Sequence, residues 1–171
     1  QFGDLDDDGS PDVFIGTGDP SSANLDIVFC GDAPGDGTVT FERCHPELTA
    51  DQGPTRGHGI AFGDVDRDGA TDVITNPGGW PAYDAERGVD TRESIHLYLG
   101  ARPAERAGRV RVRSHGRDAL GASLTFDTSP PRYAAVRSTQ GFQSQSSNWI
   151  RVPPGTETVT VRWPGGAVSE H

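Results

Sequence analysis

The chain has 171 residues, and 15 Lys and Arg against 25 Asp and Glu give it a formal net charge of −10. This acidic balance argues against nucleic acid or an anionic membrane surface as a partner. No stretch approaches the roughly 18 apolar residues of a membrane span. Only 33% of the residues are hydrophobic, while Gly supplies 23 and Pro 13, which favours short strands and turns in one ordinary or two small domains.

A nine-residue acidic pattern at 4–12 is repeated 60 residues later, at 64–72. Residues 2–13 read FGDLDDDGSPDV, and residues 62–73 read FGDVDRDGATDV. Both contain the pattern D-x-D-x-D-G-x-x-D and continue into β-branched and aromatic residues at 13–15 and 73–75, which favour strands. Each copy therefore predicts an acidic loop that leads into a strand.

The spacing within each loop is typical of a cation site. Alternate carboxylates at positions 1, 3 and 5 converge on one point, Gly at position 6 permits a sharp turn, and position 7 adds a backbone carbonyl. The last Asp, which we expect to chelate with both oxygens, completes an all-oxygen cage that suits Ca²⁺ better than Mg²⁺ or a transition metal. The sequence therefore predicts two Ca²⁺ sites with the ligands Asp4, Asp6, Asp8, Ser10 (carbonyl) and Asp12, and Asp64, Asp66, Asp68, Ala70 (carbonyl) and Asp72.

Other Ca²⁺ loops open with the same D-x-D-x-D-G. An EF-hand needs Glu at position 12, where this chain has Ile15 and Thr75. Dockerin-like loops lead into helices, and thrombospondin-type acidic repeats contain many more Asp and Cys. The remaining alternative is an acidic turn that is simply solvated.

Cys30 and Cys44 are the two cysteines of the chain. A disulfide between them closes a 15-residue loop, which contributes about 3 kcal/mol in the chain-entropy model. Two buried thiols are the alternative. We predict the disulfide and, with it, an oxidising compartment.

The Phe-Gly-Asp repeat with its acidic loop resembles the FG-GAP (VCBS-type) repeat of integrin-like β-propellers. The resemblance implies that each loop joins two strands of a propeller blade. The segment RGHGIAFG at 56–63 is similar to the strand that enters such a repeat, which makes His58 structural. Two repeats do not close a ring, so we expect the chain either to belong to a larger propeller or to self-assemble through open strand edges.

Composition changes after residue 99, and residues 100–108 predict a linker or one exposed helical turn. We predict an all-β protein with two domains, propeller-like calcium-binding repeats at 1–104 and a small β-sandwich or barrel at 105–171. Residues 109–113 alternate Arg and Val, which predicts a strand with its valines inward and three guanidiniums in solvent. Four further strands are predicted at 122–128, 133–138, 149–152 and 158–163.

The C-terminal third resembles the ASPIC/UnbV domain, which follows FG-GAP repeats in cartilage-acidic-protein-like secreted proteins and in many bacterial proteins. The similar segments are RDALGA at 117–122, GFQSQS at 141–146 and VRWPGG at 161–166. The polar run at 140–148, with Trp149 or Phe142 as a stacking surface, predicts either a carbohydrate or partner surface or a hydrogen-bonded turn.

No nucleophile elbow, P-loop, H-E-x-x-H or C-x-x-C motif is present, so we predict no enzyme. Our main prediction is an extracellular calcium-binding structural or assembly subunit. We expect it to associate with itself, as an oligomer or a fibre, or with another extracellular protein or glycan. A carbohydrate-binding or cell-adhesion module is the first alternative. Some bacterial members of the family that the chain resembles occur in natural-product gene sets, so the resemblance implies a Ca²⁺-dependent enzyme as the second alternative, with Asp64 or His58 as the first catalytic candidates.

Overall fold

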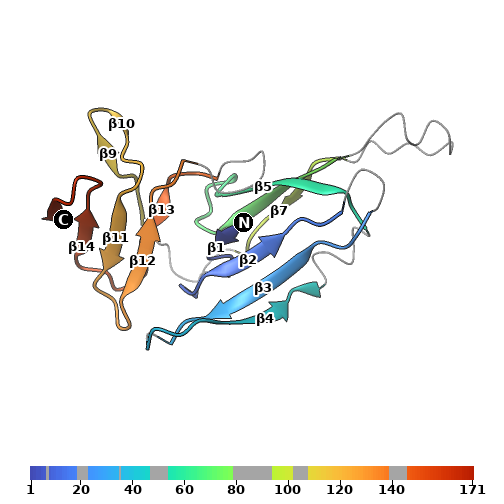
Figure 1. Cartoon of the computed structure of the whole chain (residues 1–171), viewed down its shortest axis with the longest axis horizontal. Helices are drawn as coiled ribbons and strands as arrows, with labels where there is room; N and C mark the ends of the chain where they lie inside the picture. The colour runs from blue at the N-terminus through green and yellow to red at the C-terminus, as the bar shows by residue number, and fades with distance from the viewer. Residues whose placement is uncertain are drawn as a thin grey trace.

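The computed structural model describes residues 1–6, 8–18, 23–34, 36–46, 54–78, 94–101, 108–138 and 146–171. Within these residues the chain is all-β, with fifteen strands in five antiparallel sheets (Figure 1). The predicted all-β class is therefore confirmed, although the described sheets form no closed propeller. In the described part of the chain, no helix has the length and hydrophobicity needed to cross a lipid bilayer.

The first sheet is a four-stranded meander built around the first acidic loop. The loop joins the first two strands, whose register places Phe2 opposite Val13 and Gly3 opposite Asp12. The strand predicted at 13–15 forms part of the second of them. The four strands are β1 (Phe2–Gly3), β2 (Asp12–Ile15), β3 (Ile27–Asp32) and β4 (Thr40–Cys44).

The second sheet repeats the first three strands of the first sheet. Phe62 lies opposite Val73 and Gly63 opposite Asp72, which is the register that the first sheet has across its own loop. A counterpart of β4 is absent from the described residues. The three strands are β5 (Gly57–Gly63), β6 (Asp72–Pro77) and β7 (His96–Tyr98).

These two sheets stack face to face and share one hydrophobic core. Its buried members come from both sheets: Phe14, Val28, Ile60, Phe62 and Val73. The Phe62 ring lies over Gly3 so closely that a Cβ on Gly3 would be 2.4 Å from Phe62 Cδ2, which only glycine avoids. Cys44, which is joined to Cys30 by a disulfide, packs against the edge of the same core.

Residues 108–138 and 146–171 form a second β-rich unit, called the C-terminal module below. Its main sheet has the strand order β12-β11-β14-β15, and the pairs β13-β8 and β10-β9 lie beside it. The buried core residues are Val112, Ala119, Ala122, Leu124, Phe126, Val136 and Val161. The strands are β8 (Arg109–Val110), β9 (Arg113–Ser114), β10 (Arg117–Asp118), β11 (Ser123–Phe126), β12 (Arg132–Ala135), β13 (Ile150–Arg151), β14 (Val159–Arg162) and β15 (Val168–Glu170).

The sequence predicted fewer strands here than the structure contains. The single strand expected at 109–113 is wrong, because the Val112 carbonyl accepts the Ala119 N–H at 3.0 Å and the chain turns into the hairpin of β9 and β10. The strand β15 was not predicted. The predicted linker at 100–108 and the domain boundary after residue 104 lie largely outside the described residues.

The three arginines of this segment do not all face solvent. Arg111 forms a bidentate pair with Asp118 at 2.7 and 2.9 Å, and together with the Asn148 amide it lowers the pKa of Asp118 to about 2. The Arg109 side chain is 20% exposed and lies 3.2 Å from Asp64 in the second acidic loop. The prediction of a solvated guanidinium is therefore wrong for Arg109.

The C-terminal module contacts both sheets through a short segment next to β5. Ser146 Oγ accepts the Phe62 N–H at 2.9 Å and the Gln1 side-chain amide at 2.8 Å. The Ser147 N–H donates to the Phe62 carbonyl at 3.0 Å. In Figure 1 the module accordingly lies at the left of the two sheets, on the side from which the acidic loops emerge.

The stacking of the two sheets is tested by two phenylalanines at equivalent repeat positions. Phe62 is 8% exposed in the shared core, whereas Phe2 is 56% exposed. We expect Phe62→Ala to lower the free energy of unfolding by about 3 kcal/mol and Phe2→Ala to lower it by less than about 1 kcal/mol. Urea unfolding of dilute protein measures both, and equal losses would contradict the stacking described above.

Candidate metal centre

The two acidic loops, residues 4–12 and 64–72, share one backbone design. The position-3 carboxylate accepts the N–H of position 5 at 3.1 Å in both loops. The position-5 carboxylate accepts the N–H of position 7 at 2.6 Å in the first loop and 2.8 Å in the second. Gly9 and Gly69 at position 6 have φ angles of 86° and 102°, which glycine adopts without strain.

The position-9 carboxylates connect each loop to a glycine in the third strand of its sheet or just after it. Asp12 and Asp72 are 0% and 1% exposed. One oxygen of each accepts the N–H of loop position 2 at 2.6 Å. The other accepts a glycine N–H at 2.9 Å, from Gly31 for the first loop and from Gly100 for the second. Both oxygens, which we expected to chelate the metal, therefore already accept a backbone hydrogen bond, and each keeps a second lone pair.

Burial also changes the acidity of the first of these groups. Desolvation raises the pKa of Asp12, and the nearby charges of Asp6 and Asp8 raise it further, against the two backbone hydrogen bonds that lower it. A cation beside these carboxylates would offset their mutual repulsion.

The structure brings most of the predicted acidic ligands together. In each of three sets, one side-chain ligand atom per residue lies within 4.8 Å of the others. The sets are the carboxylate oxygens of Asp4, Asp6 and Asp8; those of Asp6 and Asp12 with the Sγ of the disulfide-bonded Cys30; and those of Asp64, Asp66 and Asp72. Asp68 is not in the last set, and its Oδ1 accepts the Ala70 N–H.

The second loop contains a buried oxygen that fits a cation. Asp64 Oδ1 is buried and has no hydrogen-bond partner among the described residues, while Oδ2 lies 3.2 Å from Arg109. Leaving a buried carboxylate oxygen unsatisfied is costly unless a positive charge compensates it. Since every candidate donor is a carboxylate or carbonyl oxygen, the donor set suits a hard cation such as Ca²⁺.

Sequence reasoning missed the arginines that the C-terminal module places at both loops. Arg109 Nη2 donates to the carbonyls of Gly69 at 3.1 Å and Ala70 at 2.9 Å. The guanidinium of Arg132, from β12, lies against Gly9 of the first loop, where a Cβ would be 1.2 Å from Nη1. The alternation of Arg and Val at 109–113 marks Arg109 as a strand residue but carries no signal of a contact about 40 residues away.

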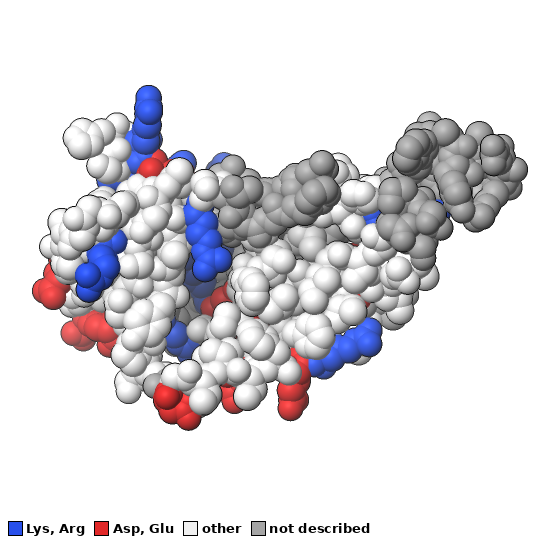
Figure 2. Space-filling view, in the orientation of Figure 1, with Lys and Arg blue, Asp and Glu red and all other residues white. Residues whose placement is uncertain are grey.

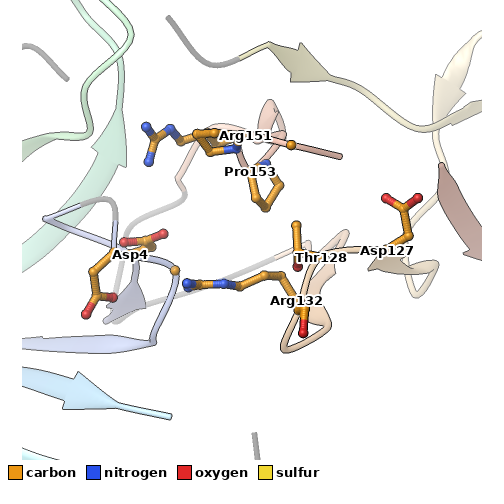
Figure 3. A pocket seen from close by; sticks show the side chains of 11 residues that line it. Asp4, Asp127, Thr128, Arg132, Arg151 and Pro153 are labelled. Atoms are coloured by element: carbon orange, nitrogen blue, oxygen red, sulfur yellow. The ribbon is translucent and has the colours of Figure 1, made fainter. Parts of the chain in front are cut away.

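A hollow of about 340 Å³ lies between the first loop and the C-terminal module and is lined by residues of both. Figure 3 shows Arg132 extending across it toward the loop that carries Asp4, with Arg151 on the opposite side. In Figure 2, basic and acidic atoms meet in this region between the two parts of the molecule. The junction is thus polar and charged, and hydrophobic packing belongs to the two separate cores.

Other predicted functional residues lie elsewhere. The His58 ring contacts the Arg56 carbonyl at 2.5 Å and fills the space beside Gly78, and it joins none of the acidic sets. Of the polar run at 140–148, residues 140–145, including Phe142, lie outside the described residues. The Asn148 amide donates to Asp118 at 3.0 Å, and Trp149 is 51% exposed.

Comparison with known proteins gives one family match. Residues 4–75 match the family described as FG-GAP-like repeat, and this span contains both acidic loops. No curated protein matches the chain.

Substitutions at position 9 and at position 3 of the second loop test whether a carboxylate has a structural role in addition to a ligand role. Without added metal, Asp72→Asn places an amide NH₂ in a buried site and leaves a partly buried N–H of Val65 or Gly100 without its acceptor, so we expect the free energy of unfolding to fall by about 2 kcal/mol. Asp66→Asn, at an exposed position, keeps an acceptor oxygen and should change it by less than about 0.5 kcal/mol. Urea unfolding in excess chelator measures both, and a similar effect of the two changes would refute the structural role of Asp72.

Proposed function

We propose that the chain is an extracellular calcium-binding structural and assembly subunit, with a Ca²⁺ ion in each acidic loop and propeller-like blades formed by the first two sheets. The observation that carries the proposal is the repetition of one loop geometry at 4–12 and 64–72, including the same hydrogen bonds at 3.1 Å from position 5 to position 3. Two loops with one sequence pattern and one internal hydrogen-bond network favour one shared ligand.

The ion's contribution in this proposal is electrostatic. Ca²⁺ in each loop neutralises carboxylates that otherwise repel one another, and thereby holds the two ends of the loop at a fixed spacing. The residues that would hold it are the acids of positions 1, 3, 5 and 9 and the carbonyl of position 7. The chain itself keeps those oxygens in place through N–H groups of the loop and through a glycine N–H in or just after the third strand.

The disulfide supports the extracellular part of the proposal. Cys30 and Cys44 are bonded, and such bridges persist in oxidising compartments. Extracellular calcium modules have dissociation constants of about 10⁻⁴ to 10⁻³ M. We expect an affinity in this range, because the ligand oxygens of each loop also accept hydrogen bonds from backbone N–H groups.

The assembly part rests on the outer faces of the two stacked sheets. In the first sheet, cross-strand register puts Phe2, Val13 and Phe29 on the face away from the shared core. Phe2, Ile15 and Phe41 are 56%, 40% and 42% exposed, and the rings of Phe2 and Phe41 meet edge to face at 6.5 Å.

The one sheet-to-sheet interface within the chain indicates what covers such a face. The equivalent face of the second sheet, with Phe62 and Val73, is buried against the first sheet. The outer face of the second sheet carries Leu97, 48% exposed, on β7, the edge strand of that described sheet. A second copy of the chain would supply the complementary face in a head-to-tail contact, which closes into a ring or extends into a fibre according to its geometry.

We propose that the C-terminal module is a small sandwich of the ASPIC/UnbV kind and that its contacts hold the loops in position. Its likeness to that domain rests on the segments named in the sequence analysis. The contacts of Arg109 with the second loop and of Ser146 with β5 support this role of the module.

Calcium binding is tested by titration calorimetry on the full chain. We expect two sites, one site after Asp6→Asn with Asp8→Asn, and one after Asp66→Asn with Asp68→Asn, because each pair removes charge from one loop. At a hundredfold excess over the dissociation constant, each filled site should add about 2.7 kcal/mol to the free energy of unfolding. Asp32→Asn with Asp36→Asn, two exposed acids outside the loops, is the control. Full binding by either loop variant would count against these ligands.

Self-association is tested by light scattering over a range of protein concentrations in millimolar Ca²⁺ and in excess chelator. We expect concentration-dependent oligomers in Ca²⁺ that Phe2→Ser with Phe41→Ser abolishes, since both rings lie on the exposed face. Tyr133→Ser, which removes a ring that is 75% exposed on the C-terminal module, should leave the oligomers intact. A wild-type chain that stays monomeric throughout would rule out the assembly role.

A further inference from the structure

The guanidinium of Arg109, from the C-terminal module, lies against the second acidic loop. Its Nη2 atom lies 2.9 Å from the Ala70 carbonyl, 3.1 Å from the Gly69 carbonyl and 3.2 Å from Asp64 Oδ2. Ala70 and Asp64 supply two of the oxygens that the D-x-D-x-D-G-x-x-D pattern assigns to Ca²⁺. The guanidinium and the predicted metal ion therefore both require the Ala70 carbonyl and the Asp64 carboxylate.

The loop does not need this arginine for its shape. The first loop makes the same hydrogen bonds between positions 3 and 5, 5 and 7, and 2 and 9. The guanidinium beside it, that of Arg132, comes from a different strand and lies against Gly9. Since the carboxylates of each loop set its backbone conformation, the effect of Arg109 on a bound cation is mainly electrostatic.

We propose that Arg109 competes with Ca²⁺ for the second loop and so couples Ca²⁺ binding to the docking of the C-terminal module. The inference rests on the proposed function, because it concerns the affinity of a site assigned there. A cation held by the Ala70 and Asp64 oxygens lies next to the guanidinium, and two positive charges at such short range repel in a poorly solvated junction. The Arg109 side chain is only 20% exposed, so water screens this repulsion weakly.

Thermodynamic linkage makes the effect reciprocal. If Arg109 weakens Ca²⁺ binding, then Ca²⁺ weakens the contact of Arg109 with the loop by the same factor. Arg109 begins β8, which pairs with β13 through Ile150 and Arg151. The loss of this contact therefore loosens the β8–β13 pair where it meets the second sheet.

The affinity is measured by titration calorimetry on full-length chain in which Asp6→Asn and Asp8→Asn silence the first loop. We expect Arg109→Gln to bind Ca²⁺ on the order of tenfold more tightly than the same chain with Arg109, because one adjacent positive charge is removed. Arg109→Lys keeps the charge and should stay within about twofold of the parent. Arg162→Gln, which removes an exposed arginine on β14, is the matched control and should change nothing.

Hydrogen exchange supplies the second measurement. In the chain with Arg109, Ca²⁺ should speed the exchange of the β8 and β13 amides several-fold, and in Arg109→Gln the exchange should no longer respond to Ca²⁺. This comparison remains informative if one variant is less stable, because each protein is compared with itself with and without Ca²⁺.

The outcomes separate this inference from the proposed function. Equal or weaker Ca²⁺ binding by Arg109→Gln, or equal gains from the Gln and Lys changes, overturns the competition while leaving the calcium site intact. No Ca²⁺ binding by any form of the second loop defeats the proposed function, and the coupling with it.

Discussion

Two buried carboxylates set the geometry on which the first two sheets depend. Asp12 and Asp72 each accept one N–H from their own loop and one from a glycine in or just after the third strand of the sheet. A buried carboxylate that loses such bonds is costly, so the loop and the strand stay in one relative position. That position gives both sheets the same register and sets Phe62 over Gly3 in the core they share. The acidic repeat is thus a structural unit as well as a candidate metal site.

The junction with the C-terminal module balances the charge that the repeats concentrate. The chain carries a formal net charge of −10, and nine of its acids lie in the two nine-residue loops. Arg109 and Arg132, from separate strands of the module, reach one loop each. Under the coupling proposed above, a guanidinium and a metal ion compete for one carboxylate and one carbonyl, which links the position of the module to the cation affinity of the second loop.

Repetition also accounts for the exposed apolar faces. Phe2 and Phe62 occupy the same place in their repeats, yet one is 56% and the other 8% exposed. Phe62 lies in the core that the two stacked sheets share, and Phe2 lies on the outer face of the first sheet. The exposed apolar face of the first sheet is the surface on which the proposed self-association depends.

The local pattern of the sequence was enough to predict the all-β class, the two loops and the strands that follow them, because a nine-residue spacing of Asp and Gly and a run of β-branched residues act over a few neighbours. Pairs distant in the sequence were beyond its reach. No local pattern predicts three of the contacts that shape the molecule. These are the packing of Phe62 on Gly3, the hydrogen bond that ends the strand at Val112, and the hydrogen bond from Arg109 to the Ala70 carbonyl. Only the tertiary structure decided these contacts, because burial and charge pairing depend on which surfaces the folded chain brings together.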